Sequence, residues 1–490
     1  MVKEKKPSAQ ASLVPFVLLA ARLTLVVKIY GSDALGGASQ VVLLLTSGVV
    51  IIIAMAFYGV PWKKIENSIG ENIHNIGSAV VILLLIGAIS GSWMISGIVP
   101  TLIVYGLKVI SPGIYLFAAC LICALVSIMT GSSWTTIATL GVALVAIGQA
   151  LGFSPAWCAG AIISGAYFGD KISPLSDTTV LASSIAGVPL FQHIRYMMTT
   201  TGPAFIIALV IYLVASLVHP SAEAAGIADV ESVMRATFNI SPWLLVVPLL
   251  TGVLIWCKVP AMLTLMGAAV MASIAALVAQ PDIIAQVAGA EGPLTFGSAF
   301  KGVITMLSTS TSVATGSESM DALVSTGGIN GMMLTVFLII SAATFGGTLV
   351  GSGMIDSLTE ALTRRVSSRV GLVGATLLTG IGSNMVMGDQ YLSIILTTRL
   401  YKNLYEKLGY EGRLLSRSAE DSATITSVLI PWNSCGMTQS TVLHVPTLTY
   451  MPFCFFNILS PIMSLVVAVF GYKIKRRDDP SRDSPTVSLP

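Results

Sequence analysis

The chain alternates long apolar stretches with short polar ones. Apolar runs lie, among other places, at residues 41–58, 80–99, 205–218, 333–350 and 455–470. An α-helix needs about 20 mostly apolar residues to cross a bilayer, and about 11 to 13 segments of this chain qualify. Backbone groups in hydrocarbon must bond within their own segment, so the pattern predicts an all-α membrane protein.

Two polar connections, at 219–241 and 280–301, divide this apolar region near its middle. We expect one polytopic membrane domain at 13–472, with short tails at 1–12 and 473–490.

The polar positions on either side of this division predict an internal repeat. Gly131 and Gly382 each begin a Gly-Ser corner, and an acidic residue follows each glycine by 39 positions, at Asp170 and Asp421. Interrupted segments that recur in two halves indicate a transporter site between inverted repeats with broken or re-entrant helices. The two copies would cover about 75–218 and about 330–470.

Composition supports the membrane interpretation. Of the 490 residues, 54% are hydrophobic and only 10% are charged, whereas soluble domains carry roughly 25% charged residues. Six dispersed cysteines and four histidines form no ligand pattern. We therefore expect no organic cofactor and no enzyme.

The placement of charge predicts the topology. Basic residues gather in both tails and near 63–64, 364–369 and 399–417, whereas 219–241 is mainly acidic. By the positive-inside bias, both termini are expected in the cytoplasm of a bacterial inner membrane, with an even number of crossings. Basic tails can also bind lipid or nucleic acid; we favour the topological explanation and expect no nucleic-acid partner.

Charged residues between two apolar stretches mark the first candidate site. Asp170, Lys171 and Asp177 surround Pro174. Proline removes a backbone donor and disfavours helical geometry in the residue before it. We expect one helix to end near Asp170 and the next to begin with Ser173 as N-cap. Free carbonyl and carboxylate oxygens would then suit a cation such as Na⁺. The alternative is a cytoplasmic loop whose charges are solvated.

A carboxylate in such a site can hold either H⁺ or Na⁺, and this competition by itself couples their exchange. Asp177 is the first candidate because serines and threonines surround it, and Asp170 is the second. Lys171 would keep Asp170 ionised or serve a structural role. Further oxygens for the ion would come from Ser173, Ser176, Thr178, Ser132 and Ser133.

The second half offers a corresponding set. Glu420 and Asp421 lie one helical turn after Arg417, so they would shape or gate the site, or form a structural ion pair. The corner at Ser383 and Asn384 predicts either close helix packing or a hairpin tip that faces the ion. In the second case Na⁺ would contact Asp177, Asp170 and Asn384. Further candidates for gating or structural roles are Asp389 and Asn433.

The run at 307–320 is rich in serine and threonine and too polar to face lipid. It is either a discontinuous segment that faces a pore or an external loop.

Two specific motifs resemble the NhaC family of sodium/proton antiporters. They are Gly169-Asp-Lys-Ile-Ser-Pro-Leu-Ser-Asp-Thr178 and Ile430-Pro-Trp-Asn-Ser-Cys-Gly436, within a resemblance that spans roughly 75–455. The resemblance implies the ion transporter superfamily architecture, with inverted repeats, re-entrant hairpins with Ser-Asn-type tips, and a homodimer. Val180 stands where many members are expected to carry asparagine.

Together these features predict a secondary transporter that exchanges Na⁺ for H⁺ by alternating access, with the lipid bilayer, Na⁺ and H⁺ as its partners. The alternative is a Na⁺/H⁺-coupled exchanger or symporter of a small organic anion or amino acid, of the malate/lactate type that the resemblance includes.

An intramembrane aspartyl protease is disfavoured because Tyr167 replaces the first glycine of its Gly-x-Gly-Asp motif. A passive channel is disfavoured because no strict pore repeat is present.

Overall fold

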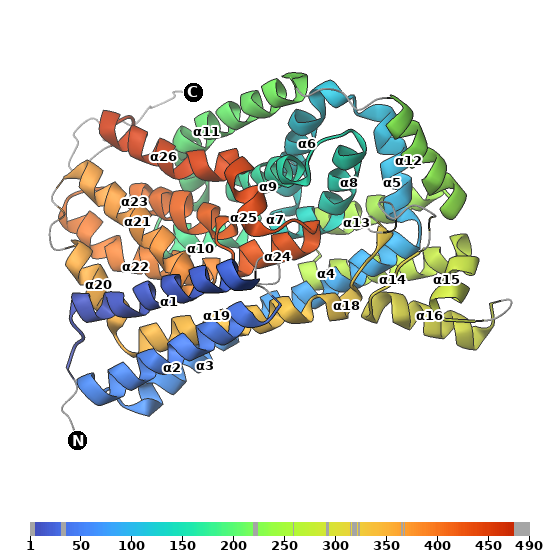
Figure 1. Cartoon of the computed structure of the whole chain (residues 1–490). Coiled ribbons are helices and arrows are strands. Elements are labelled where there is room, and N and C mark those ends of the chain that lie inside the picture. The colour runs from blue at the N-terminus through green and yellow to red at the C-terminus, as the bar shows by residue number, and fades with distance from the viewer. Residues whose placement is uncertain are drawn as a thin grey trace, which may run out of the picture.

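The computed structural model consists of helices joined by short loops (Figure 1). The structure describes residues 5–30, 36–218, 224–257, 259–290, 294–313, 315, 321, 324–363, 366 and 368–474. No β-strand occurs in these ranges, apart from one isolated bridge between Thr311 and Thr326.

Four consecutive groups of helices follow one another along the chain. The first group is α1 Ala9–Tyr30, α2 Ala38–Tyr58, α3 Trp62–Asn75, α4 Gly77–Ile95 and α5 Ile98–Val109. The second is α6 Tyr115–Thr130, α7 Ser133–Thr136, α8 Val142–Ala150, α9 Pro155–Ile172, α10 Asp177–Ala186 and α11 Leu190–Val218. The third is α12 Ala224–Thr237, α13 Val246–Trp256, α14 Ala261–Ala279, α15 Pro281–Val287, α16 Phe296–Ser308, α18 Gly328–Gly331, α19 Met333–Gly351 and α20 Met354–Thr363. The fourth is α21 Arg369–Met387, α22 Gln390–Lys407, α23 Gly412–Ala419, α24 Ser434–Leu443, α25 Thr447–Tyr450 and α26 Phe455–Phe470.

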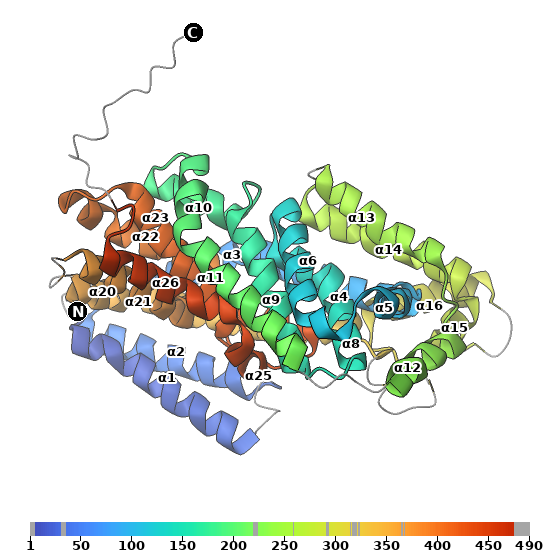
Figure 2. The same ribbon diagram turned by 90° about the horizontal axis from the view of Figure 1, so that it is seen from above.

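Figures 1 and 2 place α12 to α16 at one end of the molecule and α20 to α23 at the other, with α6, α9 and α11 between them. The helices α3 and α19 pack closely because glycines line their contact. A Cβ atom on Gly347 would lie 2.6 Å from the Cα atom of Ile69. Small residues allow helix backbones to approach in this way within a membrane.

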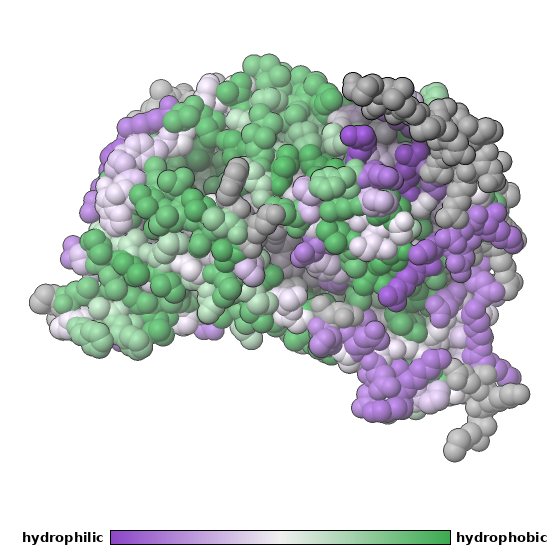
Figure 3. Space-filling view, turned by 180° about the vertical axis from the view of Figure 1, so that it is seen from behind, coloured by the Kyte–Doolittle hydropathy of each residue, from purple (hydrophilic) through white to green (hydrophobic). Residues whose placement is uncertain are grey.

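Eight helices in the described part of the chain are long and apolar enough to cross a bilayer, and three bent helix pairs raise this number to as many as 11. Figure 3 shows a largely apolar face, with hydrophilic residues gathered toward one end. Exposed leucine, valine and isoleucine side chains on α2, α11 and α14 fit contact with lipid tails. The prediction of an all-α membrane protein with broken helices is confirmed.

The second and fourth groups repeat the same order of helices. Gly131 and Gly388, which are 257 positions apart, both adopt left-handed φ angles, of 68° and 63°. When residue numbers of the second group are shifted by 257, the end of α6 coincides with the end of α21. The first residues of α7 and α22 then coincide, as do those of α9 and α23, and α10 coincides with α24 at both ends. The left-handed residue after α10 is Gly187, and the one after α24 is His444.

Equivalent hydrogen bonds fix the register of this repeat. The Ser127 hydroxyl donates to the Ala166 carbonyl at 2.6 Å, and the Asn384 amide donates to the Ala423 carbonyl at 2.6 Å. The sequence-based pairing of Gly131 with Gly382 was therefore wrong. Gly382 lies inside the unbroken helix α21, and the equivalent corner is at Gly388.

The register also separates the acidic residues that the sequence had paired. Pro174 corresponds to Pro431, as the matched helix breaks require, but Asp170 corresponds to Ser427 and Asp421 to Ser164. Each repeat thus carries a buried carboxylate at a position where the other repeat carries serine.

The helix α16, which ends at Ser308 where the serine- and threonine-rich run begins, packs against α4. The main chain of Met306 comes so close to α4 that a Cβ atom on Gly91 would lie 2.0 Å from the Met306 carbonyl oxygen. Ala314 and 316–320 lie outside the described residues, so the choice between a pore-facing segment and an external loop stays open.

Candidate functional site

A cavity of about 430 Å³ lies where the first repeat is broken. Its walls come from the corner between α6 and α7, the break between α9 and α10, and the first residues of α14 and α22. The polar side chains that line it are Ser78, Thr130, Ser132, Trp134, Thr135, Asp170, Ser176, Asp177, Thr178, Thr264, Gln390 and Tyr391.

The break between α9 and α10 differs from its prediction. The helix α9 continues to Ile172, and α10 begins at Asp177 with Ser176 as its N-cap residue. The prediction that Ser173 caps the second helix was wrong. Ser173 has the extended backbone geometry favoured before proline, and its hydroxyl donates to the Ile128 carbonyl of α6 at 2.7 Å.

The carboxylate of Asp170 is the centre of the buried polar contacts beside this cavity. Its Oδ2 accepts hydrogen bonds from the Ser133 amide at 3.0 Å and the Ser133 hydroxyl at 2.7 Å. Its Oδ1 accepts one from the Ser176 hydroxyl at 2.6 Å, and Ser176 lies 3.0 Å from the Thr178 hydroxyl. Asp170 is only 6% exposed. One carboxylate and several hydroxyl oxygens are thus gathered within reach of one small cation.

The surrounding backbone favours the charged form of Asp170. Ser133 begins a helical segment that runs without a break to Ala150. Free amides at a helix N-terminus carry partial positive charge and stabilise a nearby anion. An ionised carboxylate beside such amides can accept a cation.

The structure places Asp177 differently from Asp170. Asp177 lies in the first turn of α10, lines the same cavity and is exposed. Within the described part of the chain it makes no hydrogen bond of its side chain. The polar contacts therefore gather around Asp170, whereas the sequence had ranked Asp177 first.

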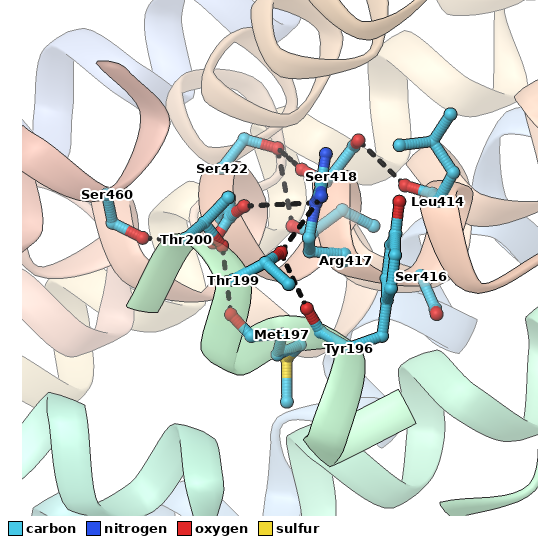
Figure 4. A network of polar contacts seen from close by, with 12 residues as sticks. Tyr196, Met197, Thr199, Thr200, Leu414, Ser416, Arg417, Ser418, Ser422 and Ser460 are labelled. Atoms are coloured by element: carbon cyan, nitrogen blue, oxygen red, sulfur yellow. Dashed lines mark hydrogen bonds and ion pairs between the residues drawn. The ribbon is translucent and has the colours of Figure 1, made fainter. Parts of the chain in front are cut away.

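A second buried cluster joins the two repeats (Figure 4). The Lys171 ammonium forms an ion pair with Asp421 and donates to the Ser460 hydroxyl at 3.0 Å. Both charged side chains are fully buried. The Thr200 and Ser460 hydroxyls also donate to Oδ1 of Asp421, at 3.2 and 3.0 Å.

Arg417 completes this cluster. Its guanidinium lies 3.9 Å from Oδ2 of Asp421, donates to the Thr199 hydroxyl at 3.2 Å and stacks 4.8 Å from the ring centre of Tyr196. The structural ion pair that the sequence suggested for Arg417 is therefore present, with Asp421 as its partner. Asp421 is also paired with Lys171 from the first repeat.

Glu420 lies beside this cluster without a hydrogen-bond partner in the described part of the chain. It is fully buried and begins a π-helical segment, Glu420–Thr424, between α23 and the second break. Such π-helical turns often occur at functional sites. Its role in shaping or gating the site stays a prediction.

The remaining candidates of the second repeat lie around its own break. Asn433 is the N-cap of α24 and donates to the carbonyl of Asn384 at 3.2 Å. Asp389 caps α22 and accepts a hydrogen bond from Ser434 at 3.2 Å. Ser383 lies inside α21 and lines a separate apolar cavity. None of these four residues lines the cavity that Asp170 lines.

Sequence reasoning missed several residues around the sites. Trp134 and Tyr391 line the cavity at equivalent positions of the two repeats. They are 257 positions apart, so an alignment of the two repeats in the correct register would have paired them and pointed to both. Thr200 and Ser460, by contrast, lie on long apolar helices with no local signal of their contact with Asp421.

Gly131→Ala is expected to reduce transport at least about tenfold because the corner and the break touch at this glycine. A Cβ atom there would lie 2.7 Å from the backbone carbon of Leu175, in addition to the left-handed φ of 68°. The matched control is Gly409→Ala, where φ is 74° but no atom lies within 4 Å, so only about 1 kcal/mol of backbone strain is expected. Transport assays in liposomes compare the two. Equal activity of both variants would mean that the close contact is unimportant.

Broken helices, paired repeats and a buried carboxylate beside a cavity define a multi-span membrane transporter. The sequence comparison then gives the particular family: the chain belongs to the Na⁺/H⁺ antiporter family, which it matches over residues 8–188 and 165–472. The resemblance to the NhaC family is confirmed.

Individual relatives include proteins with different cargoes. The Na⁺/H⁺ antiporter NhaC of Bacillus subtilis (strain 168) is 37% identical and covers 86% of this chain and 91% of its own length. The malate-2H⁺/Na⁺-lactate antiporter of the same strain is 34% identical over 84% and 85%. The arginine/ornithine antiporter ArcD of Halobacterium salinarum is 32% identical over 97% and 94%.

Among solved structures, Neisseria gonorrhoeae MtrF, described as an antimetabolite efflux pump, aligns with 91% of this chain and 94% of its own. The TM-score of this alignment is 0.37 and the sequence identity is 14%.

Proposed function

We propose that this protein exchanges Na⁺ for H⁺ across a bacterial cell membrane, with Asp170 as the group that binds both ions. The observation that carries the proposal is the set of contacts around Asp170. A buried carboxylate, two hydroxyls that contact it and a cavity that reaches it lie together at a helix break. The family and the NhaC relatives support the identity of the ions.

The exchange follows from competition for one carboxylate. Na⁺ would bind the ionised form with oxygens from Ser133, Ser176 and Thr178, while Asp177 and Ser132 on the cavity wall would attract and guide it. A proton would neutralise the same carboxylate and release Na⁺. Because the site cannot hold both ions at once, it carries either Na⁺ or H⁺ each time its opening changes from one side of the membrane to the other. Alternation of the two ions yields antiport.

Alternating access is part of the proposal. The repeated helix breaks offer two halves that can rock against each other around the site. A homodimer, as the family resemblance implies, would hold the remainder of the molecule still during this movement. The cytoplasmic placement of both termini is retained as a prediction from the charge pattern.

The test uses purified protein in liposomes with a pH-sensitive dye inside. A Na⁺ gradient is imposed without any organic solute, and the membrane voltage is clamped. We expect protons to move opposite to Na⁺, with a Michaelis constant for Na⁺ that falls as pH rises because proton competition weakens. Proton movement that is absent until an organic solute is added would refute simple Na⁺/H⁺ antiport.

A second candidate is exchange of a small cationic solute, and the cavity itself favours it. Its volume of about 430 Å³ lies in the range of sites for small organic molecules. Among the residues that the structure describes, its lining contains the carboxylates of Asp170 and Asp177 and neither lysine nor arginine; Lys258, next to Val259 in the sequence, lies outside them. This charge suits an ammonium or guanidinium group better than a dicarboxylate such as malate. Adding arginine, ornithine or malate separately to the liposome assay distinguishes these cargoes.

A further inference from the structure

We infer that the Lys171 ammonium occupies a second cation site, centred on Asp421, as a cation fixed to the protein. This inference deepens the proposed function and rests on it in one respect, namely that Asp170 is the site left open for Na⁺.

The carboxylates of Asp170 and Asp421 are surrounded by similar sets of oxygens. Around Asp170 one carboxylate meets the hydroxyls of Ser133 and Ser176. Around Asp421 one carboxylate meets the hydroxyls of Thr200 and Ser460. Each set contains one carboxylate and two hydroxyl groups, which are hard oxygen ligands for a cation.

A cation of the protein itself lies among the oxygens around Asp421. The Lys171 ammonium contacts Asp421 and Ser460 directly and lies 6.0 Å from the ring centre of Phe456. An ammonium is a compact charge of +1 with three hydrogen-bond donors. It can satisfy the carboxylate and hydroxyl oxygens that would otherwise bind a monovalent metal ion.

The two sets of oxygens differ in their access to the cavity. Asp170 lines the cavity of about 430 Å³, but neither Lys171 nor Asp421 does. Both side chains are fully buried. The first set is therefore open to exchange with ions from the cavity, whereas the second is closed around its own cation.

The chain links the two sets directly. Asp170 and Lys171 are consecutive residues at the end of α9, and they contact different partners. The Thr179 hydroxyl of α10 donates to the carbonyl of Lys171 at 3.0 Å, across the break. Asp421 and Ser460 come from the second repeat, so the fixed cation also joins the two repeats.

The inference has a specific consequence for Lys171→Met. Without the ammonium, Oδ1 of Asp421 and the hydroxyls of Thr200 and Ser460 become able to bind a free cation, while Arg417 stays 3.9 Å from Oδ2. Placing this change in an Asp170→Asn background removes the proposed transport site, so any Na⁺ response reports on Asp421 alone. The purified variants are unfolded thermally in detergent, in NaCl or in choline chloride of equal ionic strength.

We expect Asp170→Asn alone to show the same unfolding midpoint in both salts. Asp170→Asn with Lys171→Met should show a midpoint several degrees higher in Na⁺, with single-site saturation, because a ligand that binds only the folded state stabilises it. Adding Asp421→Asn should remove the response. Lys402→Met is the matched control, since the Lys402 ammonium donates to the carbonyl of Ile185 at 3.0 Å.

Two results would overturn the inference. One is a variant with Lys171→Met that is equally stable in both salts. The other is a variant that fails to fold in either salt, because Na⁺ would then not replace the ammonium. A wild-type protein that shows no Na⁺ response at Asp170 would instead count against the proposed function, and the Asp421 measurement would stand separately.

Discussion

Asp170→Asn is expected to lower Na⁺-driven proton movement to the level of empty liposomes. The amide is nearly isosteric with the acid, so the serines around it can stay in place, but it can neither carry the negative charge nor take up the proton. The measurement is proton flux under a Na⁺ gradient with the voltage clamped.

Asp177→Asn is the matched control for this prediction. Asp177 is exposed on the wall of the same cavity, where water screens its charge. An exposed charge a few ångströms away contributes on the order of 1 kcal/mol, so the apparent affinity for Na⁺ should fall by roughly tenfold or less. If Asp170→Asn keeps the wild-type rate and Asp177→Asn loses it, Asp177 is the carrier and the ranking drawn from the structure is wrong.

Asp421→Asn is expected to cause the largest loss of stability among the variants considered. Lys171 and Arg417 both contact this carboxylate in a fully buried cluster. Removing it leaves two buried cations without their shared counter-charge, and breaking a buried ion pair costs about 3–5 kcal/mol. Thermal unfolding in detergent, without added Na⁺, measures the change.

Two further variants make this prediction specific. Lys171→Met with Asp421→Leu removes the Lys171–Asp421 pair and should recover the part of the loss that comes from the unpaired Lys171, because apolar replacement of a buried ion pair is often close to neutral. The part that comes from Arg417 should remain, since Arg417 stays without its counter-charge. Asp389→Asn alters a buried acid that caps α22 and accepts from Ser434, so it should cost only about 1 kcal/mol. Equal destabilisation by Asp421→Asn and Asp389→Asn would contradict the proposed importance of the buried cations.

Local pattern predicted the break in the first repeat but not its details. Pro174 required a break, and the break is present, with α9 ending at Ile172. Which serine caps the next helix depended on a partner in another helix: Ser173 is bonded to Ile128 of α6, which leaves Ser176 at the N-cap position. Sequence spacing carries no information about such a partner.

The repeat is a similar case. Its existence was visible in the recurring polar corners, but its register was not, because identity between the halves is low. The backbone resolves it through the left-handed glycines Gly131 and Gly388 and through the equivalent bonds of Ser127 and Asn384. These depend on the path of the chain and on helix contacts rather than on which residue types resemble one another.

The sequence by itself determined the membrane class and the family, and it supplied most of the candidate polar residues, because hydropathy, helix-breaking residues and motifs are local properties. Only the tertiary structure decided which of these residues lie together. It buried Asp170, left Asp177 on a cavity wall, and paired Lys171 with Asp421 at a separation of 250 positions. Packing between helices that are distant in the sequence decides whether a charged side chain is buried and which side chain it pairs with. The sequence around a carboxylate does not contain this information.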